Sequence, residues 1–225
     1  MAPNTITLFS AISFQLPAVL FMLYNPSLSG EYPRIFYLIA AIGLFLGQTL
    51  DAIDGKQARR IGASSPIGQL FDHGCDALSG VTINIVAVCT FGLGDMPMVG
   101  MLFGVFNYIM VYLANLNEYH TGIMITQVDD FGVTETQLLQ ILTNLIVFFC
   151  PFNPFTITLG QLGLPIFADT PISIFVFFGV AYMIFKSAYL MVKMMLEKTK
   201  NPISMIFIDC IPLGVILVAC KKNKK

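Results

Sequence analysis

The chain has 225 residues, of which 56% are hydrophobic and only 11% are charged, and its formal net charge is −1. A soluble domain carries roughly 25% charged residues, so this composition excludes an ordinary water-soluble globular fold and favours lipid as the main solvent. The small net charge and the lack of basic runs interleaved with aromatic residues argue against nucleic acid as a partner.

The long apolar runs predict membrane-spanning helices. A helix needs about 20 apolar residues to cross a bilayer core, and an open sheet of such runs would leave its backbone unsatisfied in lipid. The sequence therefore predicts an all-α fold, a polytopic transmembrane bundle of about six to seven spans that forms a single domain over residues 1–225. In chain order, the expected spans are Thr5–Tyr24, Arg34–Asp54, Gly68–Leu93, Met98–Asn117, Thr134–Thr156, Ile172–Met195 and Ile203–Cys220, the last of which is short.

The charges between the spans predict how the chain sits in the membrane. The loop Gly55–Gln69 contains three basic residues and no acid, so the positive-inside bias predicts that this loop faces the cytosol. Alternation of the spans then puts the basic tail Lys221–Lys225 in the lumen, against the same rule. Either the seventh segment does not fully span, or the chain is cut short relative to a longer relative.

Ser65-Pro66 predicts the start of the third helix, as an N-cap followed by proline at the first helical position.

Four aspartates bracket this basic loop. Asp51 and Asp54 are three residues apart and Asp72 and Asp76 are four apart, so each pair shares a face of its helix. A short loop joins the two helices, which must therefore run antiparallel. Both acidic faces are expected to meet at one depth near the cytosolic boundary.

Such a cluster predicts bound cations. An aspartate at the centre of a membrane helix costs about 2.5–3.5 kcal/mol, and four together would also repel one another. Mg²⁺ and Mn²⁺ prefer carboxylate oxygens, and two such ions about 4 Å apart hold the attacking and leaving oxygens of a phosphoryl transfer. We therefore expect two Mg²⁺ (or Mn²⁺) ions. A proton relay, an ion pathway or plain headgroup-level charges would explain one aspartate pair, but two pairs with glycines, an arginine and a histidine disfavour these readings.

The residues among the acids suit a phosphorylated substrate. Gly55 and Gly68 are small where helices or substrate must approach closely. Arg59 offers a planar fork suited to a diphosphate, and Lys56 is a second candidate that could equally face lipid headgroups. His73 can share the face of the metal site, where its near-neutral pKa suits a general base.

The spacing of these residues resembles the signature of a known family. The pattern D-x-x-D-G-x-x-A-R, eight residues, then G-x-x-x-D-x-x-x-D is complete from Asp51 to Asp76. It resembles the CDP-alcohol phosphatidyltransferase family. The choline/ethanolamine phosphotransferase branch is resembled more specifically by the sequences of four segments: residues 50–60, residues 70–76, Ala2–Leu8 and Val133–Glu135. The resemblance is clear to about Gln137 and vague afterwards.

The resemblance implies an activity. A hydroxyl of diacylglycerol (or an alkyl-acylglycerol) would attack the β-phosphorus of CDP-ethanolamine or CDP-choline and release CMP. The four aspartates would bind the metals, Arg59 and Asn4 would contact the CDP-alcohol, His73 would accept the proton, and Glu135 would raise the basicity of His73. It also implies an endoplasmic reticulum (or Golgi) membrane with the active site facing the cytosol, and it leaves a homodimer open. Long members of this branch continue through further spans at their C-terminus.

Other readings stay open beside this one. Without the resemblance, Asn4 is expected to cap the first helix and Glu135 suits a helix N-terminus. The chain could transfer another alcohol, such as inositol or glycerophosphate, onto CDP-diacylglycerol, although His73 argues against that. It could be a catalytically impaired, lipid-binding homologue, although four intact aspartates argue against that. A transporter would need acids on the later spans, where Asp209 is the lone candidate.

Overall fold

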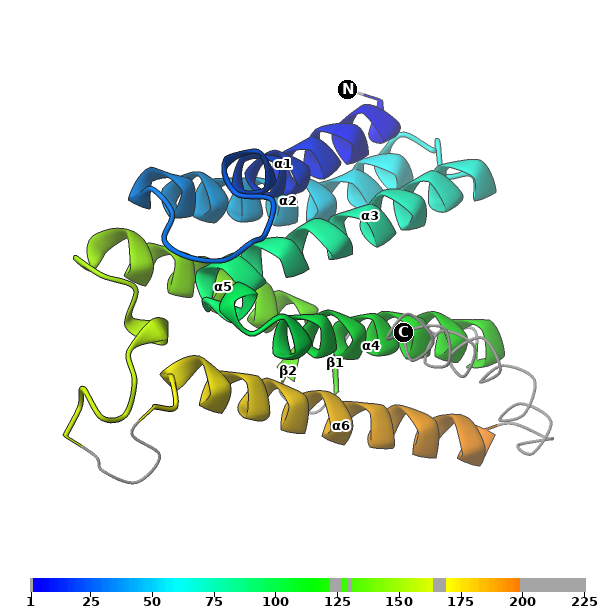
Figure 1. The fold of residues 1–225 in the computed structure, drawn as a ribbon. Helices are drawn as coiled ribbons and strands as arrows, with labels where there is room; N and C mark the ends of the chain where they lie inside the picture. The colour runs from blue at the N-terminus through cyan, green and yellow to red at the C-terminus, as the bar shows by residue number, and fades with distance from the viewer. Residues whose placement is uncertain (1, 122–126, 129–130, 164–168, 199–225) are drawn as a thin grey trace, which may run out of the picture. The chain divides into compact units, whose positions relative to one another are not determined.

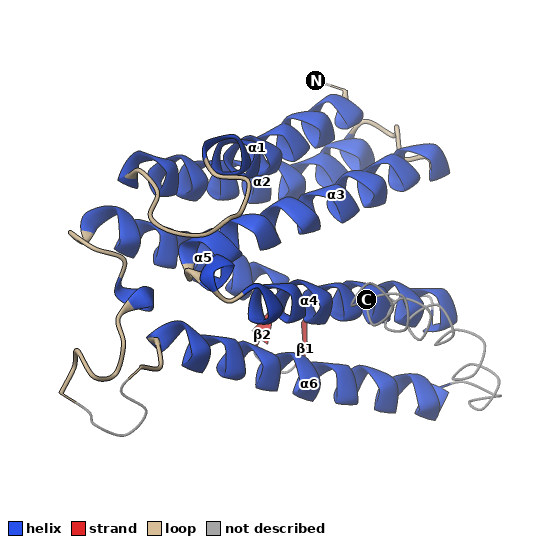
Figure 2. Ribbon diagram, viewed as in Figure 1, coloured by secondary structure: helices blue, strands red, loops and turns tan. Residues whose placement is uncertain are grey.

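Six α-helices form most of the chain that the computed structural model describes, residues 2–121, 127–128, 131–163 and 169–198 (Figures 1 and 2). The predicted all-α class is confirmed. Within the described residues, regular strand is limited to a pair of two-residue strands in the connection after the fourth helix. In order, the elements are α1 (Pro3–Tyr24), α2 (Arg34–Arg60), α3 (Pro66–Thr90), η1 (Leu93–Asp95), α4 (Pro97–Thr121), β1 (Gln127–Val128), β2 (Phe131–Gly132), α5 (Val133–Phe149), η2 (Pro154–Thr156) and α6 (Ile172–Lys198).

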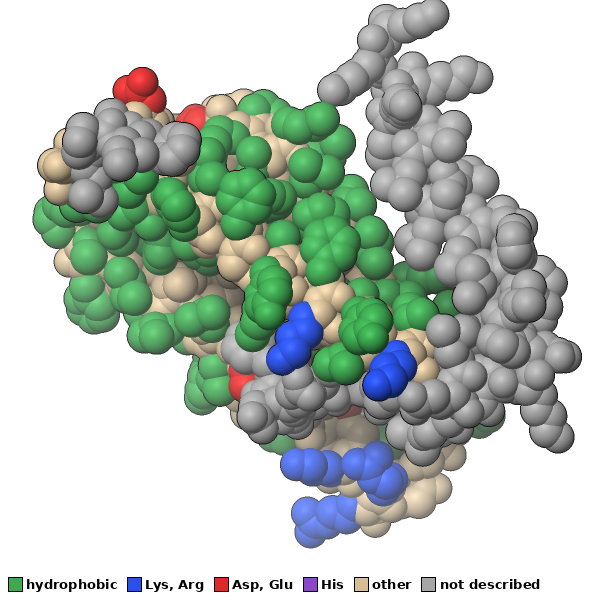
Figure 3. Space-filling view, turned by 90° about the horizontal axis from the view of Figure 1, so that it is seen from below, with side chains coloured by type: hydrophobic (Ala, Val, Ile, Leu, Met, Phe, Trp, Pro, Cys, Tyr) green, Lys and Arg blue, Asp and Glu red, His purple; other side chains and the backbone are tan. Residues whose placement is uncertain are grey.

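Several of these helices are long and apolar enough to cross a membrane. Four qualify by length and composition, namely α1, α2, α4 and α6, and α5 is a shorter apolar helix. Hydrophobic side chains are prominent on the face drawn in Figure 3, and few charged side chains are visible there. These features indicate an integral membrane protein. The expected seventh span, Asp209 and the basic tail lie outside the described residues.

The chain divides into two compact units. The first contains residues 1–104 and 133–179, and the second contains residues 105–132 and the chain from residue 180 onward. In the second unit, Leu113 is buried against Ala188 and Val192, and Phe106 packs edge-to-face on Phe185 with ring centroids 5.2 Å apart. The first unit contains α1, α2, α3 and α5, and it carries all the predicted site residues.

Small residues let α1 and α2 pack closely in the first unit. A Cβ at Gly43 would lie 2.6 Å from the carbonyl oxygen of Ser13, and one at Gly47 would lie 2.7 Å from the Phe14 ring. Ser10 adds an interhelical hydrogen bond by donating to the Gly47 carbonyl at 2.9 Å. Gly43 and Gly47 form a G-x-x-x-G pair, the spacing that brings membrane helices together. Residue numbers rise along α1 as they fall along α2, so the two helices are antiparallel.

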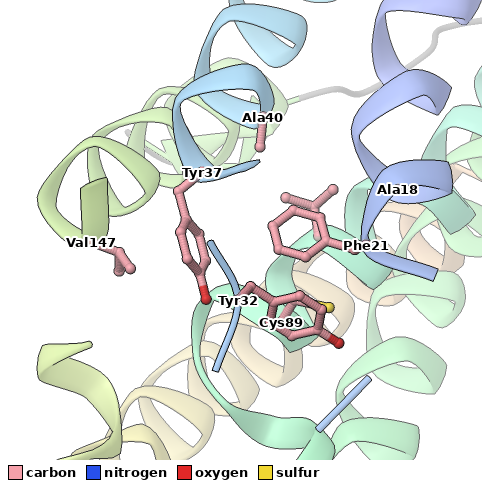
Figure 4. Packing of buried hydrophobic residues seen from close by; sticks show 8 residues of the cluster. Ala18, Phe21, Tyr32, Tyr37, Ala40, Cys89 and Val147 are labelled. Carbon is pink, nitrogen blue, oxygen red and sulfur yellow. The ribbon is translucent and has the colours of Figure 1, made fainter. Parts of the chain in front are cut away.

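An aromatic cluster holds the other end of this bundle (Figure 4). Phe21 is fully buried and meets Tyr32 and Tyr37 edge-to-face, with ring centroids 4.8 and 5.4 Å apart. The cluster also takes Cys89 from α3 and Val147 from α5. One core therefore joins α1, α2, α3 and α5 at the end opposite the aspartates.

Polar contacts fix the direction of α5. Arg34, at the start of α2, donates from Nη2 to the Pro151 carbonyl just after α5, at 2.7 Å. The Thr90 hydroxyl at the end of α3 lies 2.9 Å from Asn144 Oδ1 on α5, and both side chains are fully buried. The C-terminal end of α5 thus lies beside the N-terminal end of α2, so α5 runs antiparallel to α2.

Candidate active site

A tight turn sets the acidic face of α2 against that of α3. The Gly62 N–H donates to the Arg59 carbonyl at 3.3 Å, and the Ala63 N–H donates to the Ala58 carbonyl at 3.0 Å. Gly62 has φ +65°. This is a Schellman ending, in which a left-handed glycine stops the helix. The start of α3 follows at once, because Ser65 Oγ accepts from the Gly68 N–H at 3.1 Å and Pro66 occupies the first turn, as the sequence predicts.

The helical part of this region is longer than the sequence predicted. The expected span ended at Asp54, with a loop from Gly55 to Gln69, but α2 continues to Arg60. That boundary was wrong because Lys, Gln, Ala and Arg are good helix formers and the basic residues suit the negative end of the helix dipole. Gly55, Lys56 and Arg59 therefore lie on the helix.

The turn brings the aspartates to matching depths. Asp54 lies six residues before the end of α2, and Asp72 lies six residues after the start of α3. Asp51 and Asp76 each lie about one helical turn further from the loop that joins the two helices. Carboxylate oxygens of Asp51, Asp72 and Asp76 all lie within 4.8 Å of one another. The expected meeting of the two acidic faces is therefore observed.

Asp54 is held differently from the other three acids. It is buried, with 5% of its surface exposed, and its Oδ2 accepts a hydrogen bond from Thr7 on α1 at 2.5 Å. Asp54 is outside the three-carboxylate group, yet it interacts electrostatically with Asp51, Asp72 and Asp76. The four acids thus form one electrostatic cluster, and three of them have oxygens within 4.8 Å of one another.

The donor set suits a hard divalent cation. All the clustered groups are carboxylates, the ligands that Mg²⁺ and Mn²⁺ prefer. Asp72 Oδ1 is buried without a hydrogen-bond partner among the described residues. A buried acceptor left without a partner is costly, and a cation among the carboxylates would satisfy it. The residues present therefore fit a metal site.

The expected substrate-binding residues flank the acids. The Arg59 guanidinium folds back along α2, with Nη1 3.5 Å from the position that a Cβ of Gly55 would take. Asn4 does not cap α1, whose N-cap is Ala2. Its Oδ1 instead lies 3.6 Å from the Cβ position of Gly68, at the first turn of α3. Lys56 and Arg59 are exposed on α2.

The two residues expected to handle the proton lie on different helices. His73 is half-buried on α3, between Asp72 and Asp76 in sequence, and Glu135 is half-buried in the first turn of α5. Glu135 precedes Val147 by twelve residues, about 18 Å along a helix. Because Val147 packs near Tyr37 and α5 runs antiparallel to α2, Glu135 lies at roughly the depth of Asp51.

Two contacts between α1 and α2, one at the site and one outside it, were not predicted from the sequence. Thr7 holds Asp54 at the site. Ser10, three residues further along α1, donates to the Gly47 carbonyl and packs the two helices together away from the acids. The spacing of Thr7, Ser10 and Phe14 along one face of α1, and the G-x-x-x-G pair on α2, were the available signals. Neither pattern identifies the residue that its members contact, because that residue lies on a different helix.

Comparison with known proteins adds an independent finding. The model of the family described as CDP-alcohol phosphatidyltransferase matches residues 1–220. Cholinephosphotransferase 1 of Xenopus laevis is 40% identical over 146 residues, which cover 63% of this chain and 34% of that relative. Cholinephosphotransferase 1 of Rattus norvegicus is 41% identical over 146 residues, with 65% and 36% covered. An uncharacterized class-I family protein of Dictyostelium discoideum is 38% identical over 126 residues, with 55% and 31% covered. The match thus spans about a third of the length of these relatives.

Proposed function

Because the chain belongs to the CDP-alcohol phosphatidyltransferase family, we propose that it transfers phosphocholine or phosphoethanolamine from a CDP-alcohol to diacylglycerol and releases CMP. The observation that carries the proposal is the group of three carboxylates from α2 and α3, with oxygens within 4.8 Å. The relatives named cholinephosphotransferase support choline and its close analogue ethanolamine as the alcohol. The products would be phosphatidylcholine or phosphatidylethanolamine, made in the endoplasmic reticulum or Golgi membrane with the site facing the cytosol.

The aspartates would hold the metal ions. Asp51, Asp72 and Asp76 are the first candidates because their oxygens converge, and Asp54 is the fourth. Two divalent cations, when bound there, supply positive charge that neutralises the diphosphate and stabilises the charge that develops on the leaving phosphate.

The chain's own side chains would orient the donor. Arg59 presents a planar guanidinium beside Gly55, and such a fork can contact two oxygens of a diphosphate at once. Lys56, exposed on α2 two residues after Asp54, adds a second positive charge. Asn4, next to Gly68, offers an amide that can donate and accept hydrogen bonds to the nucleotide.

The proton of the acceptor alcohol needs a base. In the proposed step, the diacylglycerol oxygen forms a bond to the β-phosphorus, the bond from that phosphorus to the bridging oxygen breaks, and CMP leaves with the electron pair. His73 would take the hydroxyl proton, as a positioned imidazole can near neutral pH. Glu135, at the depth of the acids, would stabilise the imidazolium that results.

The test is CMP release by the purified chain in liposomes that contain diacylglycerol. We expect Mg²⁺-dependent release with CDP-choline or CDP-ethanolamine, and no turnover in Asp76→Asn or Asp51→Asn, because each variant removes a carboxylate of the convergent group. Full activity in either variant would refute the metal assignment. Release from CDP-diacylglycerol with inositol or glycerophosphate would favour another alcohol transfer. Lipid binding without CMP release would favour a catalytically impaired homologue.

A further inference from the structure

One contact of α1 reaches into the acidic cluster. The Thr7 hydroxyl lies 2.5 Å from Asp54 Oδ2 and 3.3 Å from the Pro3 carbonyl. A hydroxyl has one proton to donate, and a bond to a carboxylate is shorter and roughly twice as strong as one to a neutral oxygen. The shorter distance therefore identifies Asp54 as the acceptor.

The contact is buried on both sides. Thr7 and Asp54 each expose only 5% of their surface. A carboxylate buried without partners carries a large desolvation cost, and α1 has no charged residue to offset it. The Thr7 hydroxyl is the donor that α1 offers, and it engages one oxygen of Asp54, Oδ2.

From this geometry we infer that Thr7 is a positioning residue for the cation site. It fixes the orientation of Asp54 next to the convergent carboxylates of Asp51, Asp72 and Asp76, so that the fourth acid joins the coordination of the cations. The first turns of α1 would then support both acidic helices. Thr7 bonds to Asp54 of α2, and Asn4 lies beside Gly68 of α3. This inference rests on the proposed function.

The test measures cation binding rather than turnover. We expect Thr7→Val, which keeps the shape but removes the donor, to weaken Mn²⁺ binding about 10–100-fold, the usual effect of losing a residue that orients a ligand. Electron paramagnetic resonance of Mn²⁺ titrated into the purified protein with CDP-choline gives the affinity. Thr7→Ser keeps the donor and should restore most of it.

Ser10→Ala is the matched control. It removes a hydrogen bond between the same two helices, at the Gly47 carbonyl rather than at an acid, so it should bind Mn²⁺ as the unaltered protein does. In a background of Asp54→Asn, Thr7→Val should cause no further loss, because its effect acts through Asp54.

The outcomes separate this inference from the proposed function. If the unaltered protein binds no Mn²⁺, the proposed metal-dependent function is refuted. If it binds Mn²⁺ and Thr7→Val binds equally well, only the role of Thr7 is overturned. If Thr7→Val alone does not fold, adding Asp54→Asn should recover folding by removing the uncompensated charge, and failure to do so would also count against the inference.

Discussion

At the scale of single residues, His73 has a role that can be separated from metal binding. We expect His73→Ala to lower kcat by about 10²–10⁴-fold, the usual contribution of a positioned acid or base. Mn²⁺ affinity should stay unchanged, because the convergent group consists of carboxylates alone. CMP release and Mn²⁺ titration on the same preparation check both expectations. A variant that turns over at the normal rate would remove the base role and leave the metal site standing.

Some of the site residues could be predicted from the sequence, and others could not. The aspartates could be predicted because spacings of three and four on neighbouring helices fix a shared face, and Ser65-Pro66 marks where α3 begins. Thr7 could not be predicted, because its partner Asp54 lies 47 residues away. A lone threonine in an apolar helix shows no pattern until the packing of α1 on α2 is known.

At the scale of elements, the fit of α1 against α2 depends on Gly43. Its Cβ position lies 2.6 Å from a backbone oxygen, that of Ser13, and backbone cannot give way as a flexible side chain can. We expect Gly43→Ala to destabilise the protein by about 1–3 kcal/mol, the usual cost of overpacking. Thermal unfolding in detergent measures the change.

Gly80 on α3 provides the comparison. A Cβ there meets nothing within 4 Å, so Gly80→Ala should be neutral or should stabilise slightly, since alanine favours a helix more than glycine does. Equal stability of the two variants would show that the helices do not meet as closely as described. The helices themselves were predictable from the lengths of the apolar runs, whereas the line along which α1 meets α2 is a property of the packed pair.

At the scale of the whole molecule, the low charge of the chain makes the acidic cluster stand out. The protein carries 13 acidic residues in 225, and four of them meet in one cluster of the first unit. Lipid-facing helices can be recognised from composition because they need only apolar length. The effect of four clustered acids on the stability of the fold cannot be predicted from composition, because it depends on what binds among them.

Cations should therefore stabilise the folded protein as a whole. A ligand at about 100 times its Kd adds roughly 2.7 kcal/mol, which raises the unfolding temperature of a chain of this size by about 5–11 °C. We expect Mn²⁺ to produce such a rise over EDTA in thermal unfolding. Asp76→Asn should show a much smaller rise, yet it should be at least as stable as the unaltered protein in EDTA, because one repelling charge is gone. If EDTA and Mn²⁺ give the same unfolding temperature for the unaltered protein, the four carboxylates coexist without cations, and the physical basis of the proposed chemistry is lost.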